Sequence, residues 1–437
     1  MVSATTTKTR VDSGRTASTR SSRRLIAVLG GTTKPEDVGV ALRHLITPSS
    51  LVHGPSIQEY ERAFARQLGV GHALSFSAGR VALYGILREL DIGDGDEVLL
   101  QVPTHIVVPN AIRYVGAKPV YVDCRLDSFN MDLDQAERLI TPRTRAILLQ
   151  HTFGNPADLR GAQALAQKHG LELIEDCVHA LGATYEGRQV GSLGRAAFFS
   201  TEETKTISST MGGMAATGDS DLAARLRAFQ DECRWPSRSK TARYVSKLLL
   251  YHFLMQPSIH RYPRYIYESI GKRNPMPRAT AEEEMRGERP PDYEQRLANA
   301  QAALALGQLR RLQANLAHRH AITEMYIAIL SDAGVDTVRS LPEANPAFVR
   351  YPVWVEDRAQ VLRAEAPRAL LGTWFTSVLE ESTSPAYAGY QPGSCPRAEA
   401  AAQHLVNLPT HLRVTEQDAE VIARSIANSI PTARKSR

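Results

Sequence analysis

Two residues of opposite charge, Asp176 and Lys205, stand close together in the sequence in settings that suit cofactor chemistry. Asp176 ends an apolar run that begins at Leu173, and Lys205 follows the Ser/Thr-rich turn 200–204. A lysine amine forms a Schiff base with an aldehyde, and an aspartate can keep the nitrogen of a pyridine ring protonated. Pyridoxal 5'-phosphate needs both partners. The pattern therefore predicts Lys205 and Asp176 as catalytic residues of a site for this cofactor.

A second group of residues could hold the phosphate of such a cofactor. The small-residue turn Ser77-Ala78-Gly79-Arg80 opens a predicted helix over 81–90. Helix N-termini present free backbone N–H groups and favour bound anions. We therefore predict that the backbone of Gly79 and Arg80, together with the hydroxyl of Ser200, binds the phosphate.

The order and spacing of several short segments resemble the DegT/StrS group of sugar aminotransferases, which are fold type I pyridoxal-phosphate enzymes. The resemblance runs from about Gly54 to Ile422. It rests on the segments Gly54-Pro55-Ser56, 77–83, 115–123, 140–147, 151–158, 174–183, Gly191-Ser192-Leu193-Gly194, Lys205 with Gly212-Gly213, and Cys395-Pro396-Arg397-Ala398-Glu399. Each segment alone is weak, whereas their order is specific.

This resemblance implies a role for each matching residue. Lys205 would carry the cofactor and move a proton, and Asp176 would bond the ring nitrogen. His179 would lie beside the ring. The dehydratases of the group have His where this chain has Lys205, so the lysine favours amino transfer. The implied reaction takes an amino group from an amino acid, with L-glutamate expected, to a keto-sugar nucleotide in secondary-metabolite, antibiotic or glycan biosynthesis, by a homodimer.

Several positions depart from the family pattern. Where the family often has an aromatic residue stacked on the ring, this chain has Val107, so an aliphatic contact or His105 would replace it. Glu294 stands where the family frequently has an Asn that reaches the phosphate of a neighbouring subunit, and a carboxylate cannot donate that bond. Arg80 replaces a common Thr and would bring a charge. Glu202 and Glu203 make the turn before Lys205 unusually acidic, facing either solvent or a cationic group of a substrate.

Hydrophobic patterns alternate between helix and strand from Ile57 onward, which predicts an α/β fold. We expect a fold type I large domain, with a mostly parallel mixed sheet between helices, and a smaller α+β domain at the C-terminus. The expected divisions are a disordered basic tail (1–24), the large cofactor-binding domain (25–232), a proline-rich insertion (233–291), and a long helix with the small domain (292–437). That helix is predicted from Gln301 to Leu312 and on past Ala317.

Composition narrows the classes of function. The 437 residues carry a formal charge of +6, of which the tail 1–24 holds +5, so the rest is almost neutral and no nucleic-acid partner is expected. Four cysteines without CxxC spacing suit a reduced, cytoplasmic protein. The thirteen histidines show no metal spacing, so no metal is expected.

Two alternatives remain open. The same cofactor could act on a cyclitol or another antibiotic-precursor carbonyl, or the chain could be a regulatory protein that binds the cofactor without turnover. Residues 240–265 could form an amphipathic helix that meets a membrane or a partner, although we favour a helix that packs on its own protein.

Overall fold

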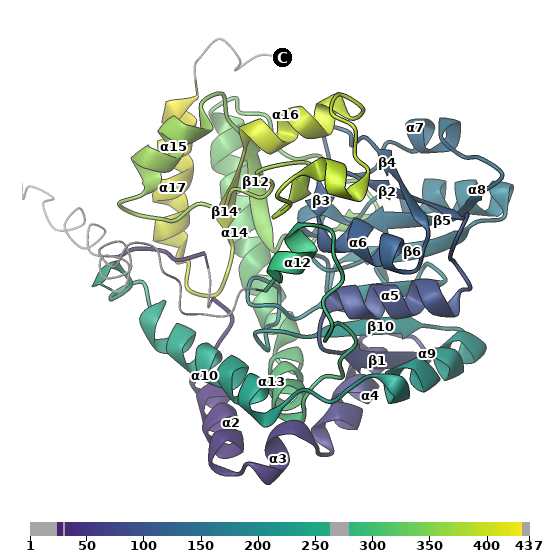
Figure 1. Cartoon of the computed structure of the whole chain (residues 1–437). Coiled ribbons are helices and arrows are strands. Elements are labelled where there is room, and N and C mark those ends of the chain that lie inside the picture. The colour runs from purple at the N-terminus through teal and green to yellow at the C-terminus, as the bar shows by residue number, and fades with distance from the viewer. Residues whose placement is uncertain (1–23, 29–30, 263–278, 431–437) are drawn as a thin grey trace, which may run out of the picture.

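A seven-stranded sheet forms the centre of the larger domain (Figure 1). The computed structural model describes residues 24–28, 31–262 and 279–430. The strands are β1 (His72–Phe76), β2 (Glu97–Gln101), β4 (Lys118–Val122), β5 (Thr144–Gln150), β6 (Glu172–Asp176), β9 (Ala196–Ser200) and β10 (Gly213–Thr217). They lie in the order β1-β10-β9-β6-β5-β2-β4. Strand β10 is antiparallel to both neighbours and the other pairs are parallel, which confirms the mostly parallel mixed sheet.

Helices cover both faces of this sheet because successive strand residues point to opposite sides. On β2, Val98 and Leu100 belong to one apolar core, whereas Leu99 belongs to the other. The first face carries α5 (Gly79–Glu89), α6 (Val107–Tyr114) and α9 (Ser220–Glu232), and the second carries α4 (Ser56–Leu68), α7 (Leu133–Arg138) and α8 (Leu159–His169). The expected helix at 81–90 is thus α5, which begins two residues earlier.

The smaller domain is built around the antiparallel pair β12 (Arg350–Trp354) and β14 (Leu405–Pro409). Its helices are α14 (Leu312–Asp332), α15 (Arg358–Glu365), α16 (Pro396–His404) and α17 (Glu416–Ser429). Strand β3 (Thr104–His105) of the large domain pairs in parallel with β13 (Leu379–Glu380). This separate two-stranded pair joins the C-terminal part of the chain to the segment that follows β2.

The expected long helix after residue 300 is wrong in one respect, because it consists of two helices. Helix α13 (Asn299–Leu309) ends before Arg310, and α14 begins at Leu312. The first packs against α4 and α2 (Pro35–Ile46), whereas the second packs against α17 of the small domain. Arg310 and Arg311 therefore separate a helix that packs on α4 and α2 from one that packs on the small domain.

Helix α10 (Arg238–Leu254) falls in the segment expected to be an insertion and packs on its own protein. Val245 and Leu248 lie in an apolar cluster with Ala41 and Leu51, the second of which belongs to α3 (Ser49–Val52). The short helix α12 (Glu282–Met285) follows and lies against α6. Residues 1–23 of the expected tail and 263–278 of the expected insertion lie outside the described residues.

The remaining short elements are β7 (Thr184–Tyr185), β8 (Arg188–Gln189), β11 (Ala344–Asn345) and the 3-10 turns Thr152–Gly154 and Pro385–Ala388. All four cysteines are buried and none forms a disulfide. Within the part of the chain that is described, no helix combines the length and the apolar character needed to cross a membrane.

Candidate active site

A cavity of about 440 Å³ opens at the carboxyl edge of the parallel strands. Three strands end in its wall, because Gln150 ends β5, Asp176 ends β6 and Ser200 ends β9. Ligand sites of α/β sheets lie at this edge, where loops from neighbouring strands meet. The structure places all the predicted site residues around this cavity: Gly79, Arg80, His105, Asp176, His179, Ser200 and Lys205.

Lys205 lies in the loop between β9 and β10, and its side chain is buried. Its ammonium nitrogen lies 4.5 Å from the centroid of the Trp374 ring. Burial lowers the pKa of Lys205 to about 8, against the opposing attraction of Glu202. A substantial fraction of this amine is therefore neutral at slightly alkaline pH, which is the form that attacks a carbonyl.

Asp176 is also fully buried, and its carboxylate accepts a hydrogen bond of 3.1 Å from the backbone N–H of Val178. Burial raises the pKa of Asp176 to about 6, while that hydrogen bond and the charge of Lys205 oppose the rise. A cationic ring nitrogen would restore the ionised form of Asp176, because a nearby positive charge favours a carboxylate.

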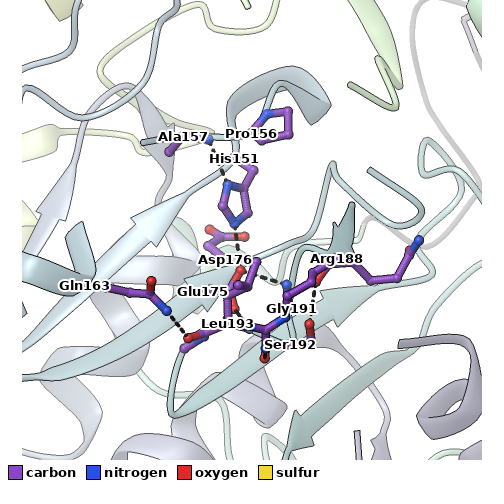
Figure 2. A network of polar contacts seen from close by, with 12 residues as sticks. His151, Pro156, Ala157, Gln163, Glu175, Asp176, Arg188, Gly191, Ser192 and Leu193 are labelled. Carbon is purple, nitrogen blue, oxygen red and sulfur yellow. Dashed lines mark hydrogen bonds and ion pairs between the residues drawn. The ribbon is translucent and has the colours of Figure 1, made fainter. Parts of the chain in front are cut away.

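Glu175, which precedes Asp176 on β6, points to the opposite face of the sheet and anchors the strand end (Figure 2). Its carboxylate accepts backbone N–H bonds from Gly191, Leu193 and Gly194 at 2.7, 2.8 and 2.6 Å. A fourth partner is Nε2 of His151 at 3.1 Å. Because the N–H of Ala157 donates to Nδ1 of His151, the proton of this ring sits on Nε2.

Cys177 lies close to this pair, and the three side chains have donor atoms within 4.8 Å of one another. Both ring nitrogens of His151 and both oxygens of Glu175 are occupied by hydrogen bonds. The cluster is therefore a hydrogen-bond network that fixes the end of β6.

The turn before α5 suits a phosphate group. In its first turn the backbone hydrogen bonds begin with the N–H of Val81, and Ala78 provides no side-chain cap, so earlier N–H groups remain for a ligand. The turn also lies directly on the ends of β9 and β10. A Cβ atom on Gly79 would come within 2.9 Å of the Phe199 carbonyl oxygen, and one on Gly213 within 2.3 Å of the Gly79 nitrogen.

The side chain of Arg80 is held by residues 279–284. Its Nε lies 2.9 Å from Glu284, and its Nη2 donates to the Ala279 carbonyl at 2.8 Å. The guanidinium of Arg80 is thus already paired with Glu284, whereas Gly79, Arg80 and Ser200 all line the cavity.

His179 lies between Phe153, whose ring is parallel to it at 6.3 Å, and Trp374 at 5.2 Å. The imidazole is buried, and within the described residues neither of its nitrogens has a hydrogen-bond partner. Burial, followed by the charge of Lys205, lowers the pKa of His179 well below its usual value. A neutral ring with unpartnered nitrogens beside Lys205 fits a polar, planar cofactor such as pyridoxal phosphate.

His105 and Val107, the expected substitutes for an aromatic stack, both line the cavity. Nδ1 of His105 accepts the Val107 N–H at 3.3 Å, and its Nε2 lies 3.3 Å from Glu381. Trp374 and Glu381 were not predicted. They come from the C-terminal domain, and no local sequence pattern around them predicts a contact with His105 or Lys205.

The acidic turn before Lys205 faces the cavity on one side and α10 on the other. Glu202 and Glu203 both line the cavity, together with Lys247 and Tyr251 of α10. The Glu203 carboxylate lies 2.8 Å from the Lys247 ammonium. Burial, followed by the charge of Glu202, raises the pKa of Glu203 to about 7. Glu294 is paired with Arg289 of its own chain.

Comparisons with known proteins all indicate one family of aminotransferases. A model of the DegT/DnrJ/EryC1/StrS aminotransferase family matches residues 36–427. The chain is 32% identical to GDP-perosamine synthase of Caulobacter vibrioides, over 85% of this chain and 90% of that protein. It is 30% identical to dTDP-3-amino-3,4,6-trideoxy-alpha-D-glucose transaminase of Streptomyces venezuelae, over 85% and 86% of the two chains. The crystal structure of S. venezuelae DesV with a ketimine intermediate superposes with a TM-score of 0.70, at 29% identity over 90% and 94% of the chains.

Proposed function

Since the chain belongs to the DegT/DnrJ/EryC1/StrS aminotransferase family, we propose that it transfers an amino group from L-glutamate to the ketone of a nucleotide-linked sugar. The activity is that of a pyridoxal-phosphate-dependent aminotransferase. The observation that carries this proposal is the burial of Lys205, Asp176 and the unpartnered His179 ring around one cavity. Relatives that act on GDP- and dTDP-linked sugars support the class of acceptor.

Residues from four parts of the sheet edge would hold the cofactor. Gly79, Arg80 and Ser200 would bind the phosphate, and Asp176 would bond the ring nitrogen. The faces or edges of the ring would contact His105, Val107 and His179. When bound, pyridoxal phosphate supplies an electron sink for the negative charge that develops at the α-carbon of the donor.

Lys205 would hold and move the proton at that carbon. Its pKa of about 8 leaves the amine partly neutral near the working pH, so it can accept the proton and later return it. Asp176 would keep the ring nitrogen protonated by its negative charge. The donor leaves as 2-oxoglutarate, and the ketone carbon of the acceptor ends with the amino group.

The proposal includes a homodimer that works in the cytoplasm in secondary-metabolite, antibiotic or glycan biosynthesis. Four buried cysteines without a disulfide suit a reducing compartment. Exposed apolar side chains near the end of α10, including Phe253 and Tyr262, provide a surface that a second copy would cover.

Absorption spectroscopy of the purified protein with pyridoxal phosphate tests the core of the proposal. We expect a band from the lysine-bound cofactor that shifts to the pyridoxamine form on addition of L-glutamate. Lys205→Ala should lose the band and essentially all turnover, whereas Lys168→Ala, which removes an exposed lysine paired with Glu137, should match the wild type. Turnover retained by Lys205→Ala would refute the catalytic assignment, and a band that no amino acid shifts would favour the regulatory alternative.

A further inference from the structure

Helix α10 contacts the loop that carries Lys205 through a buried ion pair. The Lys247 ammonium lies 2.8 Å from the carboxylate of Glu203, which stands two residues before Lys205. The side chains of Lys247 and Glu203 leave only 4% and 12% of their surface exposed. Two charges removed from water are stable only while they stay in contact. The pair therefore favours one position of the loop relative to α10.

The half of the loop that follows Lys205 is held by two other helices. Asn315 of α14 donates a hydrogen bond to the Thr206 carbonyl at 2.6 Å. Gln308 of α13 donates to the Ser208 carbonyl at 2.7 Å and accepts from the Ser208 N–H at 2.9 Å. These three bonds hold the backbone directly and involve no residue of α10.

The half of the loop that precedes Lys205 is held differently. The Glu202 carboxylate accepts bonds from the N–H and the hydroxyl of Thr204, so this contact stays inside the loop. Glu203 instead extends out of the loop to Lys247. The ion pair thus supplies an anchor on α10 for the residues just before Lys205.

Helix α10 is itself packed firmly enough to serve as an anchor. Val245 and Leu248, on either side of Lys247 in the sequence, are buried in the apolar cluster with α2, α3 and α13. Tyr251, one helical turn after Lys247, lines the cavity and has its ring centroid 5.3 Å from the Lys247 ammonium. Lys247 therefore extends from a packed helix into the cavity wall.

We infer that Lys247 is a positioning residue, which holds the loop of Lys205 in its buried position through Glu203. The inference rests on the proposed function and adds to it a residue that acts through another. The Lys205 amine lies buried, 4.5 Å from the centroid of the Trp374 ring. Because a displacement of about 1 Å can cost about 100-fold in rate, the amine needs an anchor on both sides of the loop.

Single turnovers of the cofactor-loaded enzyme with L-glutamate test the inference first. Lys247→Met should lower the maximal rate about 10- to 100-fold and change the half-saturating glutamate concentration by less than about 2-fold, because Lys247 pairs with Glu203 and not with the donor. Lys247→Arg keeps a cation and should recover much of the rate. Arg243→Met removes an exposed cation from the same helix and should match the wild type.

The pH dependence of cofactor capture by the apoenzyme is a second readout, which a merely structural ion pair would not change. Burial lowers the pKa of Lys205 to about 8. The charged groups that act on this amine are Glu202, Arg350, Asp176 and Glu381. A loop released from α10 admits water to the amine. In Lys247→Met the pH midpoint for formation of the lysine-bound band should therefore rise toward the ordinary lysine value of about 10.4.

Glu203→Gln separates positioning from a simple effect of charge, and it decides the matter if Lys247→Met fails to fold. This change weakens the anchor but keeps a neutral hydrogen bond, so the maximal rate should fall about 3- to 10-fold and the pH midpoint should rise. The loss of a negative charge near Lys205 would by itself lower the midpoint.

An unchanged rate and midpoint in Lys247→Met, or a lowered midpoint in Glu203→Gln, would overturn the positioning role while the proposed function stands. A wild type that forms no lysine-bound band would refute the proposed function and, with it, any role of the ion pair in catalysis.

Discussion

At the scale of single residues, Lys205 owes its reactivity to its surroundings. The pKa of its amine falls to about 8 through burial, and Asp176 and Glu202 limit the fall. The same burial raises the pKa of Asp176 to about 6. The pKa values of Lys205 and Asp176 are therefore closer together than those of an ordinary lysine and aspartate. Shifted pKa values of this kind are a common feature of catalytic sites.

A pH dependence of cofactor binding follows from the shifted pKa of Lys205. Below pH 8 the ammonium form of Lys205 dominates, and the neutral fraction of the amine falls about tenfold for each further pH unit. The rate at which apoenzyme forms the lysine-bound cofactor band should therefore rise with pH up to about 8 and then level. Mixing experiments between about pH 6 and 10 measure this. A rate that keeps climbing toward the ordinary lysine pKa would contradict the inferred environment.

Glu175 should contribute stability rather than chemistry. Glu175→Gln replaces acceptors with an amide that cannot satisfy all four donors around it, so we expect a loss of about 3 kcal/mol. Burial opposes ionisation, but His151 and the backbone N–H groups outweigh it and lower the pKa of Glu175. The stabilisation is therefore present above the unfolded pKa of about 4.3 and is lost as pH falls through the lower folded value.

Chemical denaturation of Glu175→Gln and Glu172→Gln at neutral and acidic pH tests this prediction. Glu172 lies on the same strand but is partly exposed, and its ion pair with Arg195 is long at 3.8 Å. Its substitution should cost less than about 0.5 kcal/mol. Equal effects of the two variants would show that the network is not needed.

Most residues around the cavity could be predicted because their position depends on local pattern. Asp176 and Ser200 end strands, and Gly79 opens a helix, so one sheet edge brings them together. Trp374 and Arg350 could not be predicted this way. They lie near Lys205 only because the small domain folds back onto the large one, and neither residue stands in a local pattern that predicts a site.

At the scale of elements, α10 joins the wall of the cavity to a separate apolar cluster. Lys247 pairs with Glu203, while Val245 and Leu248 pack with α2, α3 and α13. The sequence allowed a membrane-facing helix because Arg, Lys and His alternate with apolar residues. In the structure Lys247 and His252 are buried, so part of that polar set faces inward.

Leu248→Ala should therefore destabilise the protein by about 2–5 kcal/mol, since it opens a cavity in this cluster. Ser246→Ala on the same helix is the control, because that side chain is exposed and should matter little. Denaturant unfolding gives the free energies, and limited proteolysis shows whether α10 is released. Equal stability of both variants would mean that α10 does not depend on this contact.

At the scale of the whole molecule, we expect a dimer in solution. Phe253, Ile259 and Tyr262, which lie within ten residues of one another in the sequence, leave 54%, 41% and 71% of their surface exposed. Sedimentation velocity at micromolar concentration should give about twice the 48.1 kDa of one chain. Replacing Phe253 and Tyr262 with Ser should shift the population toward monomer. A monomeric wild type would refute the proposed assembly.

The reversed direction of β10 has a consequence for how the enzyme can move and change. Because β10 starts where β9 ends, the loop with Lys205 is fastened to the rigid sheet at both ends, at Ser200 and Gly213. Arg350 and Trp374 belong to the other domain. A hinge motion between the domains would thus open or narrow the space above the amine while the amine itself stays in place. Substitutions in the small domain can therefore change which donors or acceptors fit, while the nitrogen of Lys205 keeps its position.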